Sequence, residues 1–362
     1  MKLPSIIIGD IKTRIPIVQG AMGIGVSMHR LAAAVANEGG IGVISGAQTG
    51  FQEPDFRKNN NSANINGLRK EIRKTRALSP DGIIGVNFLA AAVNNYVELV
   101  TAAVKEKVDI IISGAGLPKN LPDLVKNSST KIAPIVSSGK AASTISKIWD
   151  RHYNYLPDAI IVEGPEAGGH LGFNMNQLLE DNTPTLMEIL KDVIDAVKPF
   201  ELKYNKKIPI IAAGGIFTGK DIAEFLNKGA AGVQMATRFV VTQECDADEN
   251  YKQAYINAKK EDLRIIKSPV GLPGRAIYNN FIKKADEGLH TIKSCYKCLK
   301  TCDPATSPYC ITDALIDSVK GDTKEGLVFA GSNVHRISKM TTVKELINEL
   351  VTEAEKYYNK DK

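Results

Sequence analysis

Residues 159–170 read AIIVEGPEAGGH, and the pattern in this stretch recurs along the chain and decides the fold. A short apolar run, Ala159–Val162, is followed at once by glycines and by small or polar residues. No polar residue interrupts the run, which is typical of a parallel strand buried on both faces. We therefore expect a strand whose end delivers a polar loop, finishing at His170, to one edge of a parallel sheet.

Eight such runs occur in the first two thirds of the chain. Amphipathic helical stretches separate them, for example Arg30–Asn37, Asn95–Lys105 and Thr185–Val197. This alternation predicts right-handed βαβ units, and eight of them predict an α/β fold of the (β/α)8 TIM-barrel class. A doubly wound sheet is the alternative, because strand order cannot be read from sequence. The predicted strands are Ile15–Val18, Gly40–Ile44, Ile83–Asn87, Asp109–Ser113, Ile132–Val136, Ala159–Val162, Ile208–Ala212 and Gly232–Met235.

The alternation stops after Phe239. We expect residues 1–239 to form the barrel and residues 240–362 to form a smaller cap or extension packed on it. This extension holds a Pro/Gly loop over Ser268–Arg275, a Cys-rich segment and a predicted C-terminal helix over Thr342–Tyr357. Thr342 and Glu345 have the spacing of a helix N-terminal capping box.

Composition limits the classes of function. The chain has 362 residues, of which 43% are hydrophobic and 24% charged, as in a soluble globular protein. A net charge of +6 and 6% aromatic residues give no support for nucleic-acid binding. No apolar stretch is long enough to span a membrane and no secretory signal is visible, so we expect a cytoplasmic protein. The segment Gln48–Arg76 is long and polar, and its second half predicts a helix with a basic face over Arg69–Arg76, either solvated or docking an acidic carrier protein.

Small residues follow the last two strands, where barrels of this class commonly bind phosphate. Gly214 and Gly215 follow the seventh strand, and Ala236 and Thr237 follow the eighth. Free N–H groups there, beside an apolar mouth, predict a flat phosphorylated cofactor, and FMN fits this description. Pyridoxal phosphate would require a lysine at a strand end, and no predicted strand ends in one.

His170 is the strongest catalytic candidate. It follows two glycines in the loop after the sixth strand, on the face where these barrels carry their chemistry. An imidazole there can donate to a developing oxyanion or exchange a proton near neutral pH. Glu163 ends the same strand and is a candidate to bind ribityl hydroxyls.

Four of the five cysteines lie close together in the sequence. They have the spacing C-x2-C-x3-C-x7-C, which predicts a metal site with four thiolates. Zinc and an iron–sulfur cluster both remain open, and reduced structural thiols are the alternative. The predicted ligands are Cys295, Cys298, Cys302 and Cys310.

The strand-end motifs together resemble the FMN-dependent nitronate monooxygenase family, which includes FMN-dependent enoyl-acyl-carrier-protein reductases. The resemblance runs from about Ile15 to Phe281. Its most specific pieces are PIVQGAMG (residues 16–23), GVNF (85–88), EGPEAGGHLG (163–172), IPIIAAGGI (208–216) and GVQMATRF (232–239). The family has a (β/α)8 barrel, in agreement with the strand count.

The resemblance also implies roles for individual residues. It places the backbone of Ala21, Met22 and Gly23 against the isoalloxazine, and the amide of Asn87 at the polar edge of the flavin. His170 matches the active-site histidine of the family. The Cys-rich segment departs from the family pattern and raises the question of the electron donor. The residues that match the ribityl and phosphate contacts are Gly168, Gly169, Gly214, Gly215, Gln234, Met235, Ala236 and Thr237.

Three functions follow from this. The leading one is a nitronate monooxygenase, in which an alkyl nitronate and O2 give a carbonyl compound and nitrite. The second is an NAD(P)H-dependent enoyl-thioester or quinone reductase that uses FMN. The third is a flavin or iron–sulfur electron-transfer subunit, which turns over no small substrate. We expect a small-molecule substrate and a homodimer.

Overall fold

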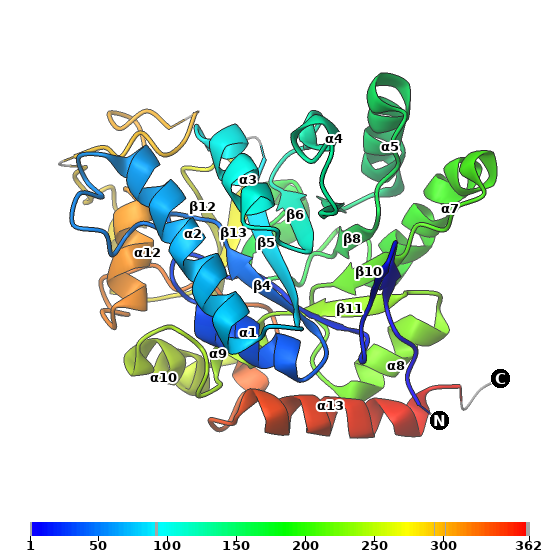
Figure 1. Ribbon diagram of the computed structural model, residues 1–362. Coiled ribbons are helices and arrows are strands. Elements are labelled where there is room, and N and C mark those ends of the chain that lie inside the picture. The colour runs from blue at the N-terminus through cyan, green and yellow to red at the C-terminus, as the bar shows by residue number, and fades with distance from the viewer. Residues whose placement is uncertain (1, 91–92, 293, 301, 360–362) are drawn as a thin grey trace.

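The computed structural model describes residues 2–90, 93–292, 294–300 and 302–359, and its centre is a closed barrel of eight parallel strands (Figure 1). Strand β8 pairs with β10, which closes the sheet. The eight predicted strands are confirmed, and the doubly wound alternative is wrong because an open sheet leaves two unpaired edges. In spatial order the strands are β10 (Ile210–Ala213), β11 (Gly232–Met235), β3 (Ile17–Gln19), β4 (Ile41–Ser45), β5 (Ile83–Leu89), β6 (Ile110–Gly114), β7 (Lys131–Val136) and β8 (Ile160–Glu163).

Successive residues of each strand face opposite sides of the sheet, and both sides are buried. In β8, Ile160 and Val162 pack in the layer beneath the helices, whereas Ile161 packs in the barrel interior. An N-terminal hairpin, β1 (Ile7–Ile8) with β2 (Ile11–Lys12), adds Ile8 to the interior cluster. The uninterrupted apolar runs in the sequence follow from this two-sided burial.

Helices form the layer outside the barrel. The predicted helices are confirmed, including the one with the basic residues, α2. Among the described residues no helix is both long and apolar enough to cross a membrane. The helices of this layer are α1 (His29–Asn37), α2 (Asn60–Leu78), α3 (Tyr96–Lys105), α4 (Leu121–Leu124), α5 (Gly139–Tyr153), α7 (Leu186–Tyr204) and α8 (Gly219–Asn227).

The C-terminal helix α13 (Val343–Tyr357) returns to the barrel and packs along α8 (Figure 1). Its predicted capping box is confirmed. Thr342 Oγ1 accepts from the backbone N–H of Glu345 at 3.1 Å, and the Glu345 carboxylate accepts from the N–H of Thr342 at 2.9 Å. The last helix of the chain therefore completes the outer layer of the barrel.

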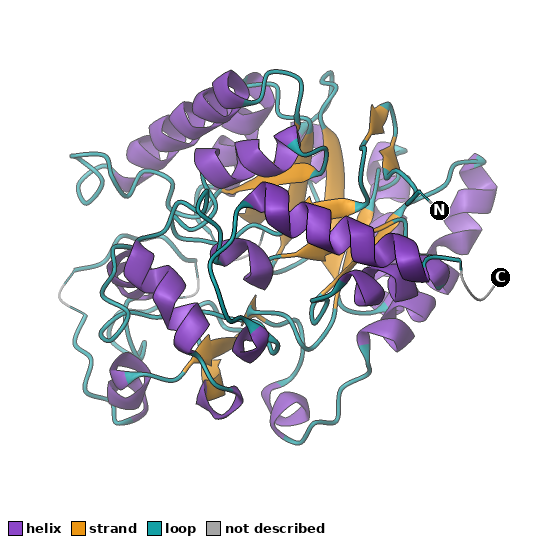
Figure 2. Cartoon of the chain, turned by 90° about the horizontal axis from the view of Figure 1, so that it is seen from below, coloured by secondary structure: helices purple, strands orange, loops and turns teal. Residues whose placement is uncertain are grey.

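The extension contains a small antiparallel sheet that the sequence did not predict. Strands β12 (Leu263–Lys267) and β13 (Pro273–Ile277) form a hairpin, and β13 also pairs with β9 (Gly169–His170) from the loop after β8. Figure 2 shows this sheet apart from the barrel strands. The expectation of a loop over Ser268–Arg275 is wrong from Pro273 onward, because a partner strand is available there. Helix α6 (Met175–Leu179) follows β9, and α9 (Thr237–Val240) follows β11. Helices α10 (Glu249–Asn257), α11 (Asn280–Asp286) and α12 (Ile311–Val319) belong to the extension.

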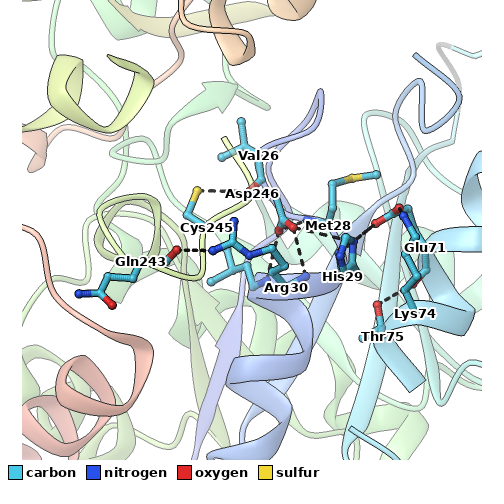
Figure 3. A network of polar contacts seen from close by, with 11 residues as sticks. Val26, Met28, His29, Arg30, Glu71, Lys74, Thr75, Gln243, Cys245 and Asp246 are labelled. Atoms are coloured by element: carbon cyan, nitrogen blue, oxygen red, sulfur yellow. Dashed lines mark hydrogen bonds and ion pairs between the residues drawn. The ribbon is translucent and has the colours of Figure 1, made fainter. Parts of the chain in front are cut away.

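One buried carboxylate joins the extension to the first barrel helix (Figure 3). Helix α1 has no capping side chain of its own at Met28. Asp246 supplies the cap instead: its carboxylate accepts from the N–H groups of Met28 at 2.8 Å, Arg30 at 3.1 Å and Leu31 at 3.2 Å. These N–H groups have no partner within the helix, so the contact satisfies donors that would otherwise be buried unpaired.

We expect Asp246→Ala to lower the unfolding free energy by about 1–2 kcal/mol, since it removes the cap of α1. Asp246→Asn, which keeps one acceptor oxygen, should lose less. The measurement is the apparent melting temperature at a fixed scan rate, with Asp81→Ala as the control because Asp81 is an exposed carboxylate in a turn. Equal melting temperatures for Asp246→Ala and the control would contradict this account of the cap.

Candidate functional site

A cavity of about 650 Å³ lies at the carboxyl-terminal ends of the barrel strands. Seven of the strands and the loop that follows β3 contribute to its lining, and the extension covers it. This is the face where TIM barrels carry their active sites. Every residue predicted for catalysis or cofactor binding lines this single cavity: Ala21, Met22, Gly23, Asn87, Glu163, Gly168, Gly169, His170, Gly214, Gly215, Gln234, Met235, Ala236 and Thr237.

Several of these positions require glycine. A Cβ on Gly168 would lie 2.6 Å from the backbone of Ala330 and Gly331, so the loop after β8 packs directly on the extension. Gly214 and Gly215 have φ values of +98° and +82°, in the left-handed region that L side chains rarely adopt. The loops after β8 and β10 therefore expose backbone groups to the cavity at close range.

Arg275, which the sequence did not single out, holds the loop after β8 in place. It projects from β13, and its Nη1 donates to the carbonyl oxygens of Pro165 at 2.6 Å and Ala167 at 2.7 Å.

No lysine or arginine is among the described residues that line the cavity. A negatively charged ligand in it must therefore be held by hydrogen bonds from neutral donors.

Glu163 ends β8 with its carboxyl group at the cavity. Desolvation raises the pKa of this carboxyl from 4.5 to about 7. No hydrogen bond joins its side chain to another described residue, so no donor offsets the cost of burying the charge. The group can therefore be protonated near neutral pH and can donate to a ligand oxygen.

His170 lies in β9 and is fixed on two sides. Its Nε2 is 2.7 Å from the Oγ of Ser268, and its ring meets Phe329 edge to face at 5.0 Å between centroids. Desolvation lowers the pKa of this imidazole from 6.5 to about 4. The ring is therefore neutral at physiological pH, with Nδ1 not bonded to any described residue.

Asn87 lies on β5 and also reaches the cavity. Its backbone carbonyl accepts from the N–H of Gly46 at 2.9 Å. Its side-chain amide has no hydrogen-bond partner within the described parts of the chain. A half-buried amide without a partner is suited to bind the polar edge of a ligand.

The far wall of the cavity is apolar and comes largely from the extension and the Cys-rich segment. It includes Val270, Leu272, Leu299, Ile311 and Leu315. Cys298 also faces the cavity, where its Sγ accepts from the Oγ1 of Thr312 at 3.3 Å. The Cys-rich segment thus forms part of the wall of the site.

The structure does not bring the four predicted metal ligands together. Within residues 2–90, 93–292, 294–300 and 302–359 there is no group of three or more His, Cys, Asp or Glu side chains placed to hold a metal ion. Cys295 is exposed, and Cys302 Sγ lies 3.1 Å from the Oγ of Ser307. Burial raises the pKa of both the Cys298 and Cys310 thiols. A common ion would require all four sulfurs within about 2.3 Å of it, so this segment would have to rearrange.

The basic residues of α2 are paired within the chain. Each of the five lies within 4.0 Å of a carboxylate, through Arg69 and Arg73 to Glu106, Lys70 to Glu53, Lys74 to Glu71, and Arg76 to Asp109. A carrier protein docking here would have to compete with these intramolecular ion pairs. The pairing favours the solvated-face interpretation of this helix.

Comparison with known proteins finds similar proteins over most of the chain. A family model described as nitronate monooxygenase matches residues 5–353. A Rhodococcus jostii RHA1 protein named (3aS,4S,5R,7aS)-5-hydroxy-7a-methyl-1-oxo-octahydro-1H-indene-4-carboxyl-CoA dehydrogenase is 27% identical and covers 94% of this chain and 92% of its own. A probable nitronate monooxygenase of Staphylococcus aureus JH9 is 27% identical over 75% of this chain and 78% of its own. FabK from Thermotoga maritima has a similar structure, with a TM-score of 0.74 and 27% identity over 95% of this chain and 94% of that one.

The raised pKa of Glu163 predicts a pH dependence of stability. The folded state binds this proton more tightly than the unfolded state, so the stabilising contribution is complete below about pH 4.5 and is lost as the pH rises through about 7. Glu163→Gln cannot ionise and should escape this loss. We expect the stability of Glu163→Gln relative to wild type to increase between about pH 5 and about pH 8.

Urea unfolding at both pH values measures this difference. Glu224→Gln, on the exposed face of α8, is the matched control and should show no such trend. The assignment of the raised pKa fails if Glu163→Gln and wild type keep a constant stability difference over this range.

Proposed function

Since the chain belongs to the nitronate monooxygenase family, we propose that it is an FMN-dependent enzyme that converts alkyl nitronates and O2 to carbonyl compounds and nitrite. Its membership in this family, inferred from the motifs, is confirmed, and the chain is an oxidoreductase. The observation that carries the proposal is the neutral, half-buried His170 at the edge of a cavity whose described lining has no cationic side chain.

The cavity residues fit FMN. The left-handed Gly214 and Gly215 and the neighbouring Ala236 and Thr237 would hold the phosphate through backbone N–H groups and one hydroxyl. The unpartnered amide of Asn87 would bind the polar edge of the ring. When bound, FMN supplies electron transfer to and from the substrate and O2.

The remaining steps depend on side chains of this chain. A nitronate is an anion, and the lining offers it hydrogen-bond donors rather than ammonium or guanidinium groups. Neutral His170 would donate one hydrogen bond to a nitronate oxygen, and the apolar wall at Leu299 and Ile311 would exclude water around it. Low polarity strengthens this hydrogen bond and prevents a proton from bulk water reaching the substrate carbon.

A second function is favoured by the length of the apolar wall. Val270, Leu272 and Leu315 extend the cavity towards the Cys-rich segment and provide room for a hydrocarbon chain. We therefore keep an enoyl-thioester or quinone reductase with NAD(P)H as donor as the alternative. His170 would then deliver the proton that accompanies reduction. The docking of an acyl carrier protein belongs to this alternative.

The electron-transfer function depends on metal at the four cysteines and receives no support from their placement. It remains a prediction with a direct measurement: about one equivalent of zinc or iron per chain after anaerobic purification. A value far below this excludes a stoichiometric four-cysteine site. A homodimer and a cytoplasmic location also remain predictions.

Anaerobic reduction, followed at the flavin absorption band, separates the two enzyme functions. We expect an alkyl nitronate to reduce the FMN-loaded protein, and NADH and NADPH to leave it oxidised. Rapid bleaching by a pyridine nucleotide would favour the reductase. Protein that takes up no flavin from added FMN would overturn both.

We expect His170→Ala to lower the rate of nitronate oxidation by about 10²–10⁴-fold, the usual contribution of a proton-handling side chain. FMN binding should be retained, because the predicted phosphate contacts come from other loops. Oxygen consumption measures the rate, and flavin fluorescence on titration measures binding. His152→Ala is the control, since His152 is exposed on α5. Wild-type rates in His170→Ala would remove the histidine from the mechanism.

A further inference from the structure

A second layer of hydroxyl groups lies behind the catalytic histidine. Ser268, at the end of β12, does not line the cavity, yet its Oγ lies 2.7 Å from His170 Nε2. The same Oγ accepts the N–H of Val270 at 3.3 Å. The position of Ser268 is therefore set by its own turn, independently of any ligand.

Tyr309, from the Cys-rich segment, continues this layer. Its hydroxyl donates to the backbone carbonyl of Lys267, the residue before Ser268, at 3.0 Å. The ring is buried and packs edge to face on Phe281 at 5.0 Å. This hydrogen bond and the packed ring hold the chain in place next to Ser268.

The direction of the hydrogen bond between Ser268 and His170 depends on the proton of the imidazole. A serine hydroxyl can both donate and accept. If Nε2 carries a proton, Nε2 donates to the Ser268 oxygen. If Nε2 carries none, the Ser268 hydroxyl donates to it. The same two atoms therefore stay hydrogen-bonded in both protonation states.

We propose that Ser268 and Tyr309 are positioning residues: Ser268 holds His170 by Nε2 in both protonation states, Tyr309 holds the chain next to Ser268 through the carbonyl of Lys267, and Nδ1 is left as the nitrogen that contacts the substrate. The roles of these two residues in turnover rest on the function proposed above. Only hydroxyl protons reorient when Nε2 gains or loses its proton, so the ring keeps its place. The Cys-rich segment therefore has a structural role that needs no metal, because it supplies Tyr309.

The first experiment needs no turnover. The ¹⁵N resonances of the imidazole nitrogens report protonation and hydrogen bonding, and the His170→Asn variant identifies those of His170. We expect Ser268→Ala to shift the Nε2 resonance of His170 and Ser268→Thr, which restores a hydroxyl, to return it towards wild type. Ser294→Ala is the control, because this hydroxyl of the extension bonds Arg57 instead. Unchanged His170 resonances in folded Ser268→Ala would overturn the proposal.

The second experiment uses nitronate oxidation by the FMN-loaded protein. Loss of positioning should lower kcat of Ser268→Ala by about 10- to 100-fold with less than about a threefold change in KM. Ser268→Thr should recover most of the rate. Tyr309→Phe, which keeps the packed ring, should lower kcat by less than Ser268→Ala. A rate in Ser268→Ala equal to that of Ser294→Ala would overturn the positioning role.

The two experiments separate this inference from the proposed function. Absence of nitronate turnover in the wild type would refute the substrate assignment, while the resonances of His170 would still test its contact with Ser268. Normal turnover that depends on His170 but not on Ser268 would refute the inference alone.

Discussion

The pairing of β8 with β10 closes the sheet, and this closure requires every strand to bury side chains on both faces. In β8, Ile160 and Val162 pack against the outer helices and Ile161 packs in the barrel interior. In the neighbouring strand β10, Ile210 packs outward and Ile211 packs inward. Because the strands are parallel, their carboxyl ends meet at one end of the barrel. Loops far apart in sequence therefore surround one cavity. The residues in these loops do not have to pack on both faces of the sheet, as the residues within the strands do.

The chemistry of the cavity depends on the absence of cationic side chains from its described lining. Loops that approach closely through glycine leave little space for long cationic side chains, and the described lining has none. Two ionisable groups that reach the cavity, Glu163 and His170, lose solvation without gaining a charged partner. Burial raises the pKa of the Glu163 carboxyl to about 7 and lowers that of the His170 imidazole to about 4, so both groups favour their neutral forms. A neutral site of this kind is suited to a substrate whose charge moves during reaction, because fixed countercharges would stabilise only one of its states.

The barrel could be predicted from the sequence because burial of a strand on both faces produces a local pattern, an uninterrupted apolar run followed by a glycine. It also predicted which strand-end residues share a cavity, since parallel strands end together. It did not predict the sheet formed by β9, β12 and β13, in which Arg275 pairs with Gly169 across more than a hundred residues. Asp246, Ser268 and Arg275 were missed for the same reason, since their partners are distant in sequence: backbone groups for Asp246 and Arg275, and the His170 imidazole for Ser268. The cysteine spacing alone leaves the metal site a prediction, because closeness along the chain does not decide whether the backbone turns the four sulfurs towards one point.

The extension supplies contacts that the eight strands and their helices do not provide. Asp246 caps the first barrel helix, β13 fixes the loop that holds His170, and the Cys-rich segment supplies both the apolar wall and Tyr309. The barrel and the extension are thus joined at several separate points. A substitution in the extension can therefore change the shape of the wall and the placement of His170 together, although the barrel residues around the cavity are unchanged. Related barrels with different extensions can acquire different substrates by this route, because the residues that contact the acyl or alkyl part of a substrate are not those that close the sheet.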